Sequence, residues 1–165
     1  MTEPIPAVRV WLRDEIVGLD LCPFAAGPLR AGRVRIASSD AQDPEGAVTD
    51  LLLEARHLDE HPVVETTLLL LTGLPVDFET FLDLTALAED VLADEGYEGE
   101  LQIVAFHPDF CFAGADPDDP ANAVNRSPVT LWHLLRAQSV ERAIAGHPDV
   151  AGIPERNARV LRERG

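Results

Sequence analysis

The sequence predicts one α/β (or α+β) domain over residues 1–165, with a small three-stranded or ferredoxin-like sheet, flanking helices and a C-terminal helical segment. Two observations support this prediction. Segments with strand character alternate with segments of helical periodicity over residues 5–106, as in sheets whose strands are joined by helical crossovers. The chain of 165 residues is also long enough to bury the core of one domain.

The first predicted elements are a helix, a turn and a short strand. Apolar residues recur at helical spacing from Ile5 to Ile16, and Gly18 is a plausible end for that helix. The segment Leu21–Ala25 contains a cysteine–proline pair and is typical of a turn. Alternating valine and isoleucine in Arg33–Ala37 then predict a strand with one apolar face.

The middle of the chain predicts helix, strand, helix and strand. An acid, a proline and an acid at Asp43–Glu45 are typical of a helix start, and that helix should run to about Leu58. Leucine and β-branched threonine in Glu65–Thr72 predict a buried strand. Asp77 is the expected cap of a helix ending near residue 96, and residues 101–106 form the third strand. Ferredoxin-like and three-layer arrangements both fit this order.

The segment His107–Pro128 lacks periodicity over about 22 residues. So long an irregular segment in a compact domain is usually a functional loop or disordered. Its aromatic residues, including Phe110 and Phe112, argue against disorder because they need a core to cover them. We therefore expect the function to reside between Ala105 and Arg136. Three helices are predicted after the loop: Thr130–Arg136, Ser139–Ala145 and Pro154–Arg164.

The composition limits the possible partners. The chain has 29 acidic residues and 13 basic ones, all arginine, for a net charge of −16. Nucleic acids and anionic membranes both require a basic face, so neither is an expected partner. Apolar runs are far too short to span a bilayer, and residues 1–6 do not have the pattern of a signal peptide. We therefore expect a cytoplasmic protein.

Two residues are candidates for catalysis. His107 directly follows the third predicted strand, where ligands bind in α/β sheets, and histidine is a common acid or base. The alternative is a His-Pro turn whose imidazole bonds to nearby backbone. Cys22 is a candidate nucleophile if a cation such as His107 or Arg126 lies close enough to lower its pKa. The alternative is a buried structural cysteine.

A polar cluster predicts an anion site. Arg126 offers a planar fork for carboxylate or phosphate, and Asn125 and Ser127 can add hydrogen bonds. In the predicted helix Thr130–Arg136, His133 and Arg136 are three residues apart and so share a face, which makes both candidates for substrate binding. The alternative is that these groups bond internally and shape turns.

Metal binding is a separate possibility, although no cofactor is part of the leading hypothesis. Cys22, His107, Cys111 and His133 are residue types that can hold zinc. Their spacing matches no standard zinc motif. The dipeptide at Cys22 and Pro23 is also found in some haem-responsive proteins, so a metal- or haem-binding module using Cys22 and His107 is an alternative function.

Four blocks of the sequence resemble an uncharacterised, mainly bacterial family known as domain of unknown function 1415. The blocks are Leu21–Phe24, Phe106–Pro108, Asn125–Pro128 and His133–Arg136. The similarity covers nearly the whole chain. Val129 departs from the family pattern, which usually has an aromatic residue there, and members often lack a cysteine at the place of Cys111, which weakens the zinc hypothesis. The resemblance implies no reaction, but it highlights Cys22, His107, Asn125, Arg126, Ser127 and His133.

The leading hypothesis is a small cytosolic enzyme of unknown reaction that acts on a compact anionic metabolite. Arg126, with Asn125 and Ser127, would hold the carboxylate or phosphate. His107 would be the acid or base, and Cys22 the nucleophile or a second proton donor. Besides the metal- or haem-binding module, the remaining alternative is a non-catalytic binding or assembly protein whose loop aromatics and Trp132 form an interface. The oligomeric state stays open.

Overall fold

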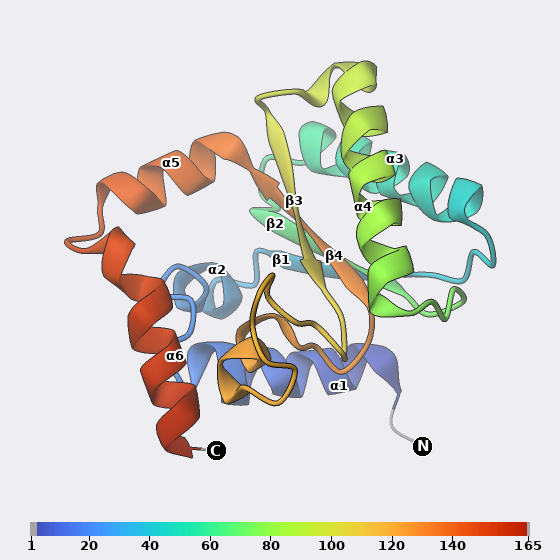
Figure 1. The fold of residues 1–165 in the computed structure, drawn as a ribbon. Helices are drawn as coiled ribbons and strands as arrows, with labels where there is room; N and C mark the ends of the chain where they lie inside the picture. Colours follow the sequence, from blue (N-terminus) through green and yellow to red (C-terminus); the bar gives the residue numbers. More distant parts are fainter. Residues whose placement is uncertain (1–2, 165) are drawn as a thin grey trace.

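A four-stranded mixed sheet forms the centre of the computed structural model, which describes residues 3–164 (Figure 1). The strands are β1 (Val34–Ser39), β2 (Thr66–Leu71), β3 (Leu101–Phe106) and β4 (Leu131–Arg136). Their order across the sheet is β1-β2-β4-β3. β1 and β2 are parallel, and β4 runs antiparallel to both of its neighbours. The last strand is therefore inserted between the second and the third.

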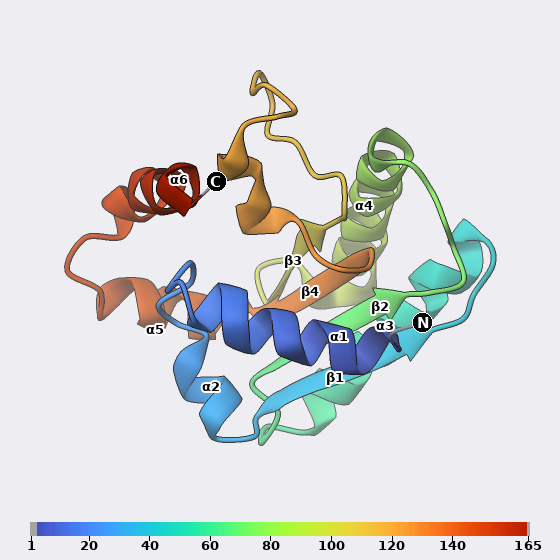
Figure 2. The same ribbon diagram turned by 90° about the horizontal axis from the view of Figure 1, so that it is seen from below.

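Helices cover both faces of this sheet (Figures 1 and 2). On one face lie α3 (Pro44–Glu60) and α4 (Phe78–Leu92), which continues as the short η2 (Ala93–Tyr97). On the other face α1 (Pro4–Trp11), extended by the π-helical η1 (Leu12–Val17), crosses the strands, and α2 (Ala26–Arg30) lies nearby. The domain thus has three layers, one of the two arrangements that the sequence left open.

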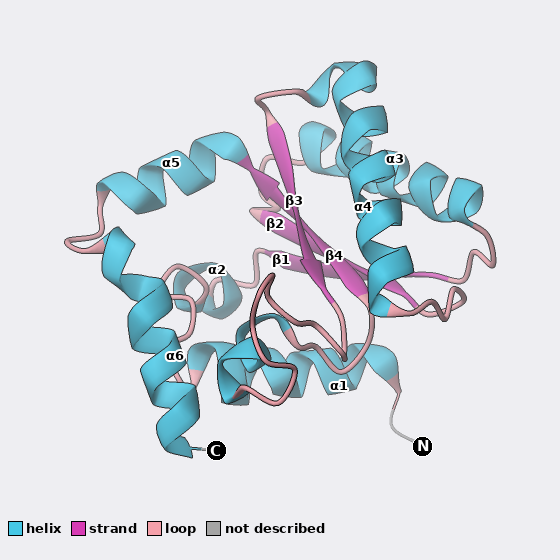
Figure 3. Cartoon of the chain, viewed as in Figure 1, coloured by secondary structure: helices cyan, strands magenta, loops and turns pink. Residues whose placement is uncertain are grey.

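The C-terminal part adds helices beside the sheet. α5 (Ala137–Ala145) follows β4 without a loop, and η4 (Val150–Gly152) leads into α6 (Ile153–Arg164). The long connection between β3 and β4 is mostly loop, with one short 3₁₀ turn, η3 (Pro120–Asn125) (Figure 3). Within residues 3–164, none of the helices combines the length and apolar character needed to cross a membrane.

Local signals in the sequence predicted several elements correctly. The Asp43 side chain accepts a hydrogen bond from Gly46 N at 2.7 Å and caps α3. Asp77 caps α4 in the same way, through Thr80 N at 2.7 Å. The N-terminal helix, the first three strands and the two C-terminal helices also lie where periodicity placed them, to within a few residues.

The predicted helix over Thr130–Arg136 is wrong, because this segment is strand β4. Leu131, Leu134 and Leu135 have helical spacing, which suggested one buried helix face. β4 is instead a central strand covered on both faces, and such strands carry apolar residues without alternation. Leu131 packs under α1 and η1, whereas Leu134 packs under α3 and α4. The sheet consequently has four strands rather than three, and its β-α-β-α-β-β order is not ferredoxin-like.

Each face of the sheet has its own apolar core because side chains alternate along the strands. Leu69, Leu71, Trp132 and Leu134 pack against α3 and α4. Leu68, Leu70 and Leu131 pack against α1 and η1. His133 and Leu135 belong to this second face by the same alternation, but they line a cavity. The core between the sheet and α1 and η1 is therefore the one that contains a cavity.

Candidate functional site

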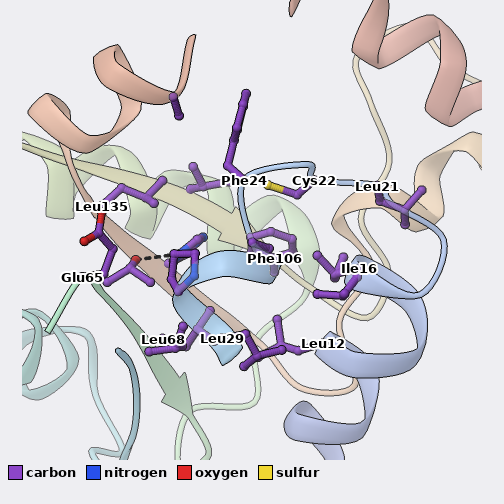
Figure 4. A pocket seen from close by; sticks show the side chains of 18 of the residues that line it. Leu12, Ile16, Leu21, Cys22, Phe24, Leu29, Glu65, Leu68, Phe106 and Leu135 are labelled. Carbon is purple, nitrogen blue, oxygen red and sulfur yellow. Dashed lines mark hydrogen bonds between the residues drawn. The ribbon is translucent and has the colours of Figure 1, made fainter. Parts of the chain in front are cut away.

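An apolar cavity of about 330 Å³ lies between the second face of the sheet and the helices that cover it (Figure 4). Its floor comes from β2, β3 and β4, and its walls come from η1, the Leu21–Ala25 turn, α2 and α5. Apolar side chains form most of the lining, among them Trp11, Leu12, Ile16, Leu29, Leu68 and Phe106. Interiors of this size normally pack with few voids larger than water, so the hollow is a specific feature of the fold.

The cavity extends from the core to the surface. Leu21 and Leu68 are 3% and 2% exposed, whereas Phe24 and Val140 are only half-buried. Glu65 and Leu135 lie at the end of the cavity away from Ile16 and Leu21 in the view of Figure 4. The cavity lining therefore runs from partly exposed side chains to fully buried ones.

Small residues on α5 help to keep this space open. Ser139, Val140 and Ala143 face the cavity at helical spacing, and only Ala137 of this helix is buried. Larger side chains at Ser139 and Ala143 would occupy the volume that the cavity provides. α5, which follows β4 directly, therefore forms one wall of the cavity.

His133 is the polar group set into the floor of the cavity. It lies opposite Leu68 of β2 and Val104 of β3 in the sheet register. Its Nε2 is 2.8 Å from Thr66 Oγ1, and the dashed line in Figure 4 marks this bond. Burial lowers the pKa of His133 from 6.5 to about 4, so the imidazole is neutral at physiological pH. The ring of Phe106 lies 6.2 Å from the imidazole, centroid to centroid.

Cys22 lines the same cavity from the turn after η1. Burial raises the pKa of its thiol, and the nearby Asp20 carboxylate raises it further, despite backbone hydrogen bonds that act the other way. The neutral thiol is therefore favoured near pH 7. In this environment Cys22 is a small, weakly polar part of the wall.

Glu65 contributes the negative charge of the cavity lining. One carboxylate oxygen lies 3.3 Å from Arg33 Nη2, and the glutamate side chain is 21% exposed. Arg33 itself does not line the cavity.

His107 lies in the other core and does not line the cavity. Its Nδ1 accepts a hydrogen bond from Asp109 N at 3.0 Å, so its Nε2 carries the proton and donates to Val76 O, also at 3.0 Å. The ring packs against Phe78 and Phe81 of α4 and is 4% exposed. Both ring nitrogens are thus bonded to backbone atoms. This bonding, in a His-Pro turn, is the alternative to a catalytic role that the sequence left open.

Arg126 holds the long loop together. Its Nε donates to Phe110 O at 2.7 Å and its Nη2 to Pro117 O at 2.8 Å. The side chain of Asn125 donates to Ala105 O at 3.1 Å, and the Ser127 hydroxyl donates to Val129 O. Each of these polar groups therefore bonds to backbone carbonyls of the loop or of β3.

Asn122 was not among the predicted site residues, yet it is the most buried polar residue of this loop. It is 0% exposed, accepts from Phe112 N at 3.0 Å and donates to Asp116 O at 2.9 Å. Its burial shows that the loop has an ordered interior of its own. The many asparagines and aspartates of this loop could have indicated such an interior, because these residues commonly bond to nearby backbone.

Arg136 and His133 do not share a face, contrary to the prediction. Residues three apart in a strand point to opposite sides of the sheet. Arg136 lies at the carboxyl end of α3, where its Nη2 donates to Leu58 O at 2.6 Å and to Val64 O at 2.7 Å. The guanidinium thus joins the end of α3 to the start of β2, away from the cavity.

The proposed zinc ligands are not gathered in one place. Over residues 3–164, no group of three or more histidine, cysteine, aspartate or glutamate side chains is arranged to hold a metal ion. Cys22 packs on the α1 face of the sheet, whereas His107 packs against α4 on the other. Cys111 lies in the loop, with its Sγ 3.5 Å from Ala115 O. The geometry therefore does not support the four-ligand site.

The aromatic residues proposed for an interface are divided between core and surface. Trp132 is 0% exposed, and its Nε1 donates to Thr85 Oγ1 at 2.9 Å, so it is unavailable to a partner. Phe112 is 41% exposed and its ring contacts that of Phe110, with centroids 5.0 Å apart. Of these three residues, Phe110 and Phe112 in the loop are accessible at the surface, and Trp132 is not.

The fold and the cavity define the class of protein: a three-layer α/β domain with one face of its sheet hollowed to the size of a small molecule. The chain belongs to the family described as Protein of unknown function (DUF1415), which matches residues 3–165. This confirms the resemblance found in the four sequence blocks. No curated protein and no solved structure matches the chain.

Proposed function

We propose that the protein binds a small, mainly apolar organic molecule in the cavity beneath α1, η1 and α5. The observation that supports this most directly is the cavity itself, whose volume of about 330 Å³ falls within the range of small-molecule sites. Such sites combine apolar walls with a few polar groups that fix orientation. His133 and Thr66 supply polar groups of this kind at the floor.

The cavity favours an uncharged ligand. The neutral imidazole of His133 and the neutral thiol of Cys22 offer no positive charge to an anion. Glu65 adds a negative charge at the rim, although its pairing with Arg33 reduces its effect. The sequence-based prediction of an anionic metabolite depends on Arg126, which lies outside this cavity. Anion binding at Arg126 stays a separate prediction.

Filling the cavity from α5 tests the proposal. Ala143 faces the space, so Ala143→Phe should occupy it, whereas Ala145→Phe adds the same ring to an exposed position of the same helix. The probe is 2-naphthol, a neutral aromatic molecule small enough for the cavity. Nuclear magnetic resonance would follow the indole N–H of Trp11 and the backbone amides of β2 and β4 during titration.

We expect saturable shifts at Trp11 and His133 in the wild type and in the control Ala145→Phe. Ala143→Phe, in which the added ring fills the cavity, should no longer bind the probe. Val140→Trp is a second filling variant in case Ala143→Phe does not fold. The proposal fails if 2-naphthol leaves the wild-type spectrum unchanged. It also fails if the folded filling variants bind 2-naphthol as tightly as Ala145→Phe does.

A further inference from the structure

The hydroxyl of Thr66 determines which nitrogen of His133 carries the proton. Thr66 Oγ1 lies 2.7 Å from Leu134 O and 2.8 Å from His133 Nε2. A carbonyl oxygen can only accept, so the single hydroxyl hydrogen is directed to Leu134 O. The hydroxyl oxygen must then accept from the imidazole. Nε2 of His133 is therefore the protonated nitrogen.

The other ring nitrogen is left as a hydrogen-bond acceptor. A neutral imidazole has one N–H, so Nδ1 of His133 has a free lone pair. Among residues 3–164, Nδ1 has no hydrogen-bond partner. Two side-chain atoms of those residues are both inaccessible to solvent and without a hydrogen-bond partner, namely His57 Nδ1 and Thr67 Oγ1. Nδ1 of His133 is not one of these two atoms, so it is accessible to solvent. Because His133 lines the cavity, a ligand can reach this acceptor.

We infer that the cavity selects an apolar molecule carrying a hydroxyl or N–H group, which donates its hydrogen to Nδ1 of His133. This inference rests on the proposed function and specifies the chemical class of its ligand. A ligand without a donor would displace water from Nδ1 and leave a buried acceptor unpaired, which costs affinity. A carboxylate would place an anion against the same lone pair.

Thr66 is the positioning residue in this scheme, because it fixes the tautomer without donating to the ligand. Thr66→Val keeps the shape of the side chain but removes the hydroxyl that accepts from Nε2. The imidazole is then free to place its proton on Nδ1 and to donate to a ligand. Thr66→Ser retains the hydroxyl and should preserve the wild-type preference.

Four matched probes test the inference: 2-naphthol, which donates; 2-methoxynaphthalene, which only accepts; naphthalene; and 2-naphthoate. We expect 2-naphthol to bind the wild type and Thr66→Ser about tenfold more tightly than 2-methoxynaphthalene, the value of one buried hydrogen bond. In Thr66→Val the ratio should fall to about threefold or less. Nitrogen-15 chemical shifts of the His133 ring should show the Nε2–H tautomer in the free wild type.

The outcomes separate the two proposals. If none of the four probes binds, the proposed function itself fails. If the probes bind but the wild type does not prefer 2-naphthol, or if the ring shifts show Nδ1–H, the inference fails while ligand binding stands. If Thr66→Val keeps the full preference with the ring still protonated at Nε2, Thr66 is not the residue that fixes the tautomer.

Discussion

His133 and Arg136 lie three residues apart on β4 and act on opposite faces of the sheet. His133 bonds to Thr66 on the cavity face, and Arg136 bonds to the end of α3 on the other. The two residues, which the sequence grouped as substrate ligands, therefore have separable roles. Substitutions at each should affect different properties of the protein.

Arg136→Ala should destabilise the fold without weakening ligand binding. The guanidinium bonds to Leu58 O and Val64 O, and each hydrogen bond from a charged donor to a carbonyl is worth about 2 kcal/mol. We expect a loss of at least about 2 kcal/mol in urea unfolding. Arg142→Ala, on the exposed part of α5, is the control and should change little. A stable Arg136→Ala protein that no longer binds 2-naphthol would instead assign Arg136 to the binding site.

The half-buried imidazole of His133, in the floor of the cavity, should make the protein less stable below neutral pH. The pKa of this histidine is about 4 in the folded protein and 6.5 in the unfolded chain. Above pH 6.5 both states are neutral, and between pH 6.5 and 4 only the unfolded state takes up a proton. Stability is therefore fully present above pH 6.5 and falls as the pH is lowered towards 4.

Urea unfolding of the wild type and of His133→Asn at pH 7.5 and pH 5 measures this effect. His133 should account for about 2 kcal/mol of the wild-type loss between these two pH values. Ala145→Phe, which changes an exposed position that carries no ionisable group, should keep the wild-type pH dependence. Equal pH dependence in the wild type and in His133→Asn would show that the imidazole titrates freely in the folded protein.

The parts of the fold that the sequence predicted are those determined locally. The caps at Asp43 and Asp77 each bond to a backbone N–H three residues ahead, so the pattern of a few residues is enough to find them. β4 required knowledge of its neighbours, because burial on both faces depends on β2 and β3 lying on either side of it. Without that knowledge, helical spacing of its leucines was the stronger signal.

The cavity could not be predicted from the sequence for the same reason, because it depends on which elements lie side by side. Cys22 and His133 were both singled out, but 111 positions separate them and only the fold brings them to one cavity. Thr66, which fixes the ring of His133, is part of an apolar strand and carries no motif. The polar cluster around Arg126 predicted an anion site, but the same residue types also bond to backbone carbonyls within the loop. The sequence alone could not distinguish these two roles.

Arg126→Ala should loosen the loop between β3 and β4. The side chain joins Phe110 O to Pro117 O, and its removal leaves both carbonyls without this donor. We expect limited proteolysis to cut the variant faster within residues 107–120 than it cuts the wild type. Arg56→Ala, an exposed arginine on α3, should behave as the wild type.

The same variant tests the predicted anion site. If Arg126 serves only the loop, phosphate and acetate should shift the melting temperature of the wild type and of Arg126→Ala equally at constant ionic strength. A stabilisation of the wild type alone, saturating with anion concentration, would establish an anion site at Arg126 in addition to its bonds within the loop.

Cys22 should react slowly with alkylating agents when the protein is folded. Burial raises the pKa of its thiol, so the reactive thiolate is scarcer at pH 7.5 than in an unfolded chain. In a Cys111→Ser background Cys22 is the one remaining thiol, and iodoacetamide labelling followed by mass spectrometry gives its rate. The rate should increase when urea unfolds the chain.

Saturation with 2-naphthol should slow labelling of Cys22 in the folded protein further, since the probe and Cys22 share the cavity. Labelling that is faster in the folded state than in urea would mean that the fold activates the thiol, and Cys22 would then be the nucleophile that the sequence predicted.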